Sequence, residues 1–292
     1  MSWSESIRTN YLSGANNQFI LHGNVNDRLL LPADKSDMTG KSSKARVGNL
    51  KDYLVAYQLE KFDIVLSYEL GSGLRVESGF DTFKKLNPRE LPKNDPVKGI
   101  GYLDYFLRYC ANLRNINPAD RTGDEAPSIA GKNYHIAFVI LAADLIFPMS
   151  RQTRDYQLSS MASVVRSWSQ ETHFLDQNLA VFLVTENLND LHPLLSGNQR
   201  AAQLEIEMPG ADDLSEAFGY FAETYPKSLA NFSENPQFPA QRLAGASLGS
   251  VEGLLKTREF LNDPLVEDDL ADLKKKLVEQ DSQGLIEFIE PT

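Results

Sequence analysis

The sequence predicts an α/β fold in which a five-stranded, mostly parallel sheet is followed by a smaller helical domain. Three observations lead to this prediction. Continuous apolar runs recur along the first 185 residues, and amphipathic helical patterns lie between them. The strand-like runs then stop after Pro209 and Gly210. Because strands that alternate with helices imply crossover connections, we expect parallel strands covered by helices on both faces.

The continuous runs are rich in β-branched and aromatic residues and are bounded by turn residues, which is typical of strands buried on both faces. They cover residues 18–25, 62–68, 134–142 and 178–185. A fifth run, 203–208, alternates instead, with Leu204, Ile206 and Met208 on one face and Glu205 and Glu207 on the other. Alternation indicates an edge strand, so we expect 203–208 at one edge of the sheet and 134–142 inside it.

The helices are predicted from apolar residues spaced three or four apart. In the α/β part such stripes run through Leu50, Tyr53, Leu54 and Tyr57, through Leu103, Phe106, Leu107 and Cys110, and through Leu158, Met161, Ala162, Val165 and Trp168. Further helices are expected over 214–225, 240–257 and 267–280, whereas 32–48 and 115–133 lack periodicity and are expected to be loops. We therefore expect an α/β domain over 1–210, a helical domain over 211–280 and a tail or linker over 281–292.

Composition excludes several classes of protein. The net charge of −11 argues against binding to nucleic-acid phosphates. The longest apolar run, 136–147, contains Asp144 and is too short to span a bilayer, and no apolar run follows Arg8 as a secretory signal requires. Cys110 is the single cysteine, so no disulfide forms within one chain. A cytoplasmic setting, without nucleic acid or membrane, is the expectation.

Asp144 is the first residue that could carry chemistry. It follows the apolar run 135–143, and a carboxylate at the end of a parallel strand lies where open α/β sheets bind ligands and where nucleotide-hydrolysing enzymes hold magnesium. The next residue is Leu145, whereas an active enzyme of that class usually has a water-activating glutamate there. The alternative is a buried strand that simply ends at a helix-capping aspartate.

Residues 180–210 resemble the stretch of AAA+ ATPases that runs from the sensor strand to the edge strand. Thr185 and Asn187 stand at the strand end, a Leu-His-Pro turn follows at 191–193, and Arg200 precedes the alternating run. The resemblance implies that Asn187 faces a nucleotide and that Arg200 reaches the nucleotide of a neighbouring subunit, since the guanidinium fork suits phosphate oxygens. The alternatives are a strand-end asparagine that satisfies its own loop and a solvated arginine. Residues 239–260 likewise resemble the lid helices of AAA+ modules, so the resemblance covers roughly 15–280 and implies a P-loop NTPase-like sheet with a C-terminal helical lid.

The phosphate-binding loop is where the sequence departs from AAA+ ATPases. That loop should follow the first strand as G-x-x-x-x-G-K-S/T. Here the slot begins at Gly23 and Asn24, lacks a second glycine and a lysine, and places the negative charge of Asp27 where phosphates would lie. A Gly-Lys-Ser triplet that includes Lys41 and Ser42 occurs 17 residues after Gly23 and could serve as a displaced loop.

The resulting hypothesis is a degenerate AAA+ module that no longer hydrolyses ATP efficiently and serves assembly or scaffolding, as part of a homo-oligomeric ring or before a downstream ATPase module. No cofactor is predicted firmly, and ATP with magnesium at Asp144 stays open. The apolar stripe at Leu285, Ile286, Phe288 and Ile289 resembles a linker into a following module. Two alternatives remain: an active ATPase with an unorthodox loop around Lys41, and an α/β adaptor without nucleotide. No protein client is indicated.

Overall fold

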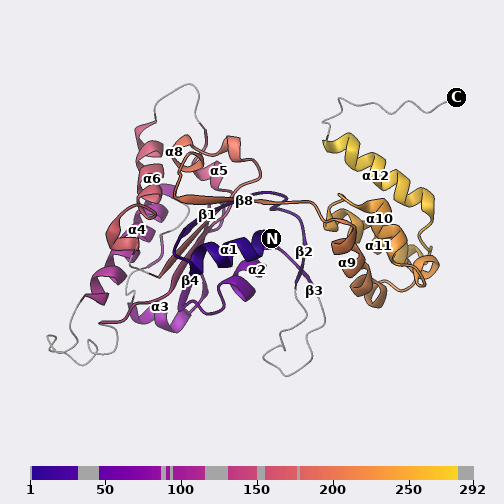
Figure 1. Ribbon diagram of the computed structural model, residues 1–292, viewed down its shortest axis with the longest axis horizontal. Helices are drawn as coiled ribbons and strands as arrows, with labels where there is room; N and C mark the ends of the chain where they lie inside the picture. The colour runs from indigo at the N-terminus through magenta and orange to yellow at the C-terminus, as the bar shows by residue number, and fades with distance from the viewer. Residues whose placement is uncertain are drawn as a thin grey trace. The chain divides into compact units, whose positions relative to one another are not determined.

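The computed structural model describes residues 2–31, 46–86, 90–92, 95–115, 131–149, 155–175 and 178–281, and it divides into two compact units. The first unit comprises residues 1–25 and 51–206, and the second comprises 26–50 and 207–292. Figure 1 shows the sheet of the first unit in indigo to orange and the helices over 211–281 of the second unit in orange to yellow. Residues 26–50, which the sequence analysis assigned to the α/β domain, thus belong with the helical unit.

A six-stranded sheet in the order β5-β4-β6-β7-β1-β8 forms the first unit. Its strands are β1 (Gln18–Gly23), β4 (Ile64–Glu69), β5 (Gly73–Ser78), β6 (Ile136–Ile140), β7 (Leu179–Val184) and β8 (Ala201–Ile206). All neighbouring pairs are parallel except β4 and β5, which are antiparallel. The predicted α/β fold with a mostly parallel sheet is confirmed. The predicted number of five strands was wrong, since the sheet has six. Strand β5 was missed because its sequence, GLRVES, is short and alternating.

The two predictions about strand position hold. β8 lies at an edge beside β1, and β6 lies inside between β4 and β7. Every residue of β6 and β7 is buried, whereas Gln203 and Glu205 of β8 are exposed, as alternation requires. Met208 was expected to face the core, but it lies beyond the end of β8 and is 44% exposed.

Helices cover both faces of this sheet. Alternate strand residues such as Ile20, Phe138 and Val181 share one core cluster with helices α4 (Pro96–Arg114) and α6 (Tyr156–Ser167). The shorter helices of the unit are α3 (Phe80–Leu86), α5 (Ala143–Ile146), α7 (Thr172–Leu175) and α8 (Pro193–Ser196), with a 3-10 turn at Leu188–Asp190. Helix α1 (Trp3–Leu12), helix α2 (Leu50–Tyr53) and a π-helical turn at Leu54–Gln58 belong to the opposite face, where Phe19 and Phe182 stack.

The second unit is helical and carries a small hairpin. Its helices are α9 (Ala211–Thr224), α10 (Gln237–Leu243), α11 (Leu248–Leu261) and α12 (Glu267–Asp281), with a 3-10 turn at Ala230–Phe232, and its hairpin pairs β2 (Leu29–Leu31) with β3 (Arg46–Gly48). The helix expected over 240–257 is two helices, because Gly245 adopts a left-handed φ of +81° between them. Leu30 and Val47 of the hairpin pack on the core of this unit. In the described ranges, no helix is long and apolar enough to cross a membrane.

Candidate functional site

The carboxyl ends of β1, β6 and β7 meet at one edge of the sheet because the three strands are parallel neighbours. Asp144 and Thr185 are brought together there, and the buried Thr185 hydroxyl donates a hydrogen bond of 3.0 Å to Asp144 Oδ1. Ala142, just after β6, has a left-handed φ of 46°, an uncommon conformation for a residue with a side chain that is concentrated at functional sites. Leu145 is 62% exposed beside this pair and offers no group that activates water.

The turn after β1 is closed by hydrogen bonds within the protein. Gly23 has a φ of +90°, and its N–H donates to the carbonyl of Glu186 at 2.9 Å. The N–H of Asn24 donates to the Ile206 carbonyl at 2.8 Å, and the N–H of Val25 donates to the Gly23 carbonyl at 2.8 Å. A phosphate-binding loop instead points consecutive amides at the ligand. These three amides therefore have protein acceptors where phosphate oxygens would be needed.

Asp27 belongs to the second unit, where its carboxylate binds the N-terminus of α11. Oδ2 accepts from the N–H of Leu248 at 2.7 Å, and Oδ1 accepts from the N–H of Gly249 at 2.8 Å. Ser247 is the N-cap residue and accepts from Ser250. The first turn of a helix has unpaired amides and partial positive charge, so a carboxylate is stabilising there. From the sequence, Asp27 was expected only to repel phosphate, because no local pattern links residues 27 and 248.

Of the other predicted nucleotide residues, Asn187 contacts the Asp144–Thr185 pair only through its backbone carbonyl. Asn187 is exposed, its side chain accepts from the N–H of Asn189 at 3.0 Å, and its carbonyl accepts from the Thr185 hydroxyl. That local bonding matches the alternative of a strand-end asparagine satisfying its own loop. Lys41 and Ser42 lie outside the described residues.

The donor set does not fit a magnesium nucleotide. Of the groups described at this edge, Asp144 is the one predicted ligand for magnesium, and one of its oxygens already accepts from Thr185. The described part of the chain holds no cluster of three His, Cys, Asp or Glu side chains that could bind a metal ion. Magnesium in nucleotide sites is shared between protein oxygens and the phosphates, and the amides that would position those phosphates are bonded elsewhere.

Arg200 lies at the amino-terminal ends of the parallel strands, opposite the ends that carry Asp144 and Thr185. It directly precedes β8, and Ala201 pairs with Gln18, the first residue of β1. The 6-residue strand β1 therefore separates Arg200 from the Gly23 turn by about 20 Å. Its side chain is exposed, with Nη1 3.5 Å from the Gln170 carbonyl, and it borders a hollow of about 510 Å³.

A buried polar network fixes the turn that presents Arg200. Asn198 is 3% exposed, and its Nδ2 donates to Gln18 at 2.7 Å and to the Ser169 hydroxyl at 2.9 Å. Its Oδ1 accepts from the N–H of Arg200 at 3.2 Å. Asn16 donates to the Arg200 carbonyl at 2.9 Å. These hydrogen bonds hold the backbone at Arg200, while its exposed guanidinium lies 3.5 Å from the Gln170 carbonyl.

In the second unit, Glu252 is a buried carboxylate with three partners. Arg28 lies 3.1 Å away, Lys256 lies 2.9 Å away, and the Tyr225 hydroxyl donates at 2.9 Å. Burial raises the pKa of Glu252, but the hydrogen bonds from Lys256 and Tyr225 and the charge of Arg28 outweigh it and hold the pKa below its usual range. Arg28 and Asp27 thus tie the 26–50 segment to α11 at two adjacent points.

Comparison with known proteins agrees with the resemblance to AAA+ ATPases. Residues 2–207 match the family described as AAA+ chaperone, N-terminal Rossmann-like domain. No curated protein matches the sequence. A solved structure, that of the E. coli MS115-1 HORMA:CdnC:Trip13 complex, contains a chain similar to this one at 12% identity and a TM-score of 0.49, over 92% of this chain and 77% of that chain. The family match is the ground for the assignment, and on that ground this chain belongs to the AAA+ chaperone family through its N-terminal Rossmann-like domain.

Proposed function

We propose that this chain is a degenerate AAA+ module that does not turn over ATP and acts in the assembly of an ATPase ring or larger complex. The observation that carries the proposal is the bonding of the Gly23, Asn24 and Val25 amides to protein carbonyls. Phosphoryl transfer depends on preorganised donors and cations around the phosphates. A loop whose amides are committed elsewhere, with no lysine in the slot after Gly23, does not supply them.

Nucleotide binding is the first test. Calorimetry of the purified chain with ATP and magnesium is expected to show no binding with a low-micromolar dissociation constant, which would correspond to a binding free energy of about −8 kcal/mol. A steady-state phosphate-release assay is expected to show no turnover above background. Tight binding that Lys41→Ala abolishes would establish the displaced loop and an active ATPase, whereas tight binding unaffected by that substitution would place the nucleotide elsewhere and also reject the proposal.

Arg200 is the residue we assign to assembly. It lies at the strand ends opposite the Asp144–Thr185 pair, so it cannot reach a nucleotide held at that pair in the same chain, and its guanidinium is exposed. A planar fork of this kind suits a carboxylate or phosphate of a neighbouring subunit. Truncating an interface arginine that bridges charge typically costs 2 kcal/mol or more.

The assembly test compares Arg200→Ala and Arg200→Lys with Lys84→Ala as a matched control, since Lys84 is an exposed cation on α3. Sedimentation of the full chain is expected to show a shift toward smaller species for both Arg200 variants, because lysine keeps the charge but lacks the fork. Circular dichroism should be unchanged in all three variants. If Arg200→Ala sediments like the parent, Arg200 is a surface arginine and the assignment fails.

A further inference from the structure

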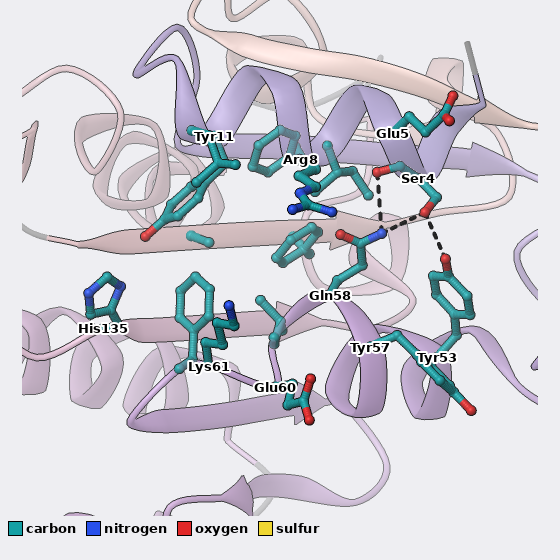
Figure 2. A pocket seen from close by; sticks show the side chains of 17 residues that line it. Ser4, Glu5, Arg8, Tyr11, Tyr53, Tyr57, Gln58, Glu60, Lys61 and His135 are labelled. Atoms are coloured by element: carbon teal, nitrogen blue, oxygen red, sulfur yellow. Dashed lines mark hydrogen bonds between the residues drawn. The ribbon is translucent and has the colours of Figure 1, made fainter. Parts of the chain in front are cut away.

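A groove of about 530 Å³ lies on the sheet face opposite α4 and α6, between α1 and the segment 57–62 (Figure 2). Phe19, Ala180 and Phe182 of β1 and β7 lie beneath it. This volume lies within the range of sites that bind ligands, about 300–1,000 Å³. None of the residues discussed at the Asp144 edge or around Arg200 lines it.

Hydrogen bonds join the two walls of the groove at one end. Ser4 Oγ lies 2.7 Å from the Tyr53 hydroxyl, and Gln58 Nε2 donates to Ser4 Oγ at 2.6 Å and to the Ser4 carbonyl at 3.2 Å. Tyr53 and Gln58 flank or belong to the π-helical turn, a feature that is rare and often found at functional sites. The groove is therefore preformed, and a ligand would not have to order its walls.

Two cations that line the groove, Arg8 and Lys61, have no ion-pair partner among the residues that the structure describes. Arg8 comes from α1 and Lys61 from the opposite wall, and neither side chain forms an ion pair or hydrogen bond with the described residues. Glu5 is on the same wall as Arg8, but its carboxylate accepts from the Ser2 N–H in the capping box of α1. Figure 2 shows the Glu60 carboxylate turned away from Lys61. The groove thus offers positive charge from both sides, in a chain whose net charge is −11.

The rest of the lining is aromatic and hydrogen-bond donating. The rings of Tyr11 and Phe62 lie 5.4 Å apart, and Leu12 beside them is 71% exposed. Burial raises the pKa of Tyr11 to about 12, so its hydroxyl stays neutral and able to donate. A ligand that matches this lining combines apolar side chains with carboxylates.

We propose that the groove binds the segment Leu285–Glu290 of a second copy of this chain. That segment reads LIEFIE, so apolar residues are interleaved with Glu287 and Glu290, and it lies outside the described residues. Its carboxylates complement Arg8 and Lys61, and its apolar side chains match the aromatic lining. An extended peptide held in a groove by side-chain pockets and complementary charge is a common mode of recognition. The inference rests on the proposed function only in that an assembling module meets other copies of itself.

The test is a charge swap in the full chain, read by sedimentation over a range of concentrations. The groove variant is Arg8→Glu with Lys61→Glu, and the tail variant is Glu287→Lys with Glu290→Lys. Each alone is expected to weaken self-association at least tenfold, about 1.4 kcal/mol. The matched control, Lys84→Glu with Lys85→Glu, makes the same charge change on exposed residues of α3 and should associate like the parent.

Mixing the two variants separates a second copy from other occupants. In the mixture each tail meets a groove of opposite charge on the other variant, so association is expected to return to within about threefold of the parent. Parent-like association of either variant alone overturns the proposal, as does a mixture that stays dissociated. A parent chain that is monomeric at every concentration, with the groove filled by its own tail or by a small anion, also overturns it. None of these outcomes bears on ATP binding, so the proposed loss of ATP turnover is tested separately.

Discussion

Replacing Asp27 with alanine tests whether this residue serves the helical unit and not a phosphate site. The substitution removes the carboxylate that accepts from the Leu248 and Gly249 amides at 2.7 and 2.8 Å. Hydrogen bonds to a charged group contribute about 1.5–3 kcal/mol, and loss of a helix cap costs about 0.5–2 kcal/mol. Because Asp27 is only half-buried, water can solvate part of what it leaves, and we expect a loss of about 2 kcal/mol in the free energy of unfolding.

The assay is urea unfolding of the full chain, followed by circular dichroism, with calorimetric titration of ATP in parallel. Asp27→Asn keeps one acceptor oxygen and should lose about half as much stability. Asp272→Ala is the matched control, since Asp272 is exposed in the middle of α12, and it should stay within about 0.5 kcal/mol of the parent. If Asp27→Ala is as stable as that control and gains affinity for ATP, then Asp27 repels phosphate and the capping role is wrong.

Three further outcomes are expected. Gly23→Ala should destabilise the chain by about 1–2 kcal/mol more than Gly14→Ala in urea unfolding, because both glycines have positive φ but only at Gly23 would a Cβ meet the Ile206 carbonyl, at 2.8 Å; equal losses would mean the turn relaxes. Glu252→Gln should be less stable than the parent at neutral pH, since a carboxylate whose pKa is lowered by folding stabilises the folded state at pH values above its usual pKa. The difference in the free energy of unfolding between parent and variant should shrink as the pH falls below about 4, and a difference that is independent of pH would contradict this. Cys110 is buried and its pKa is raised to about 12, so thiol reagents at pH 8 should label it only on unfolding, and rapid native labelling would count against the structure.

The interior of the sheet could be predicted because its signal is local and strong. β6 and β7 are continuous apolar runs, and burial of every residue in them follows directly from that pattern. The edge position of β8 follows in the same way from alternation. Asp144 and Thr185 were placed at strand ends in the sequence, and parallel pairing of β6 with β7 is what brings them into contact.

The remaining features depend on partners distant in sequence or on weak local signals. Helix α1 went unpredicted, although Ser2 and Glu5 form a capping box that announces a helix start. Arg8 was consequently considered only as a flank of a signal peptide and not as part of a groove. Strand β5 was not predicted, because it is short and begins at Gly73, the second glycine of a Gly-Ser-Gly sequence. The π-helical turn at Leu54–Gln58 was also not predicted, because the apolar spacing there is the same as that of an ordinary helix.

The proposed inability to bind phosphate rests on the strand pairing as much as on the missing lysine. Gly23, the last residue of β1, is still paired with Ile206 of β8, and the N–H of the next residue, Asn24, donates to the Ile206 carbonyl. A phosphate loop requires the chain to curl away from the sheet at this point so that its amides become free. Introducing a lysine at position 28 or 29 would add a charge without releasing those amides. Because backbone hydrogen bonds occupy these amides, we expect no single side-chain substitution to make this turn bind phosphate.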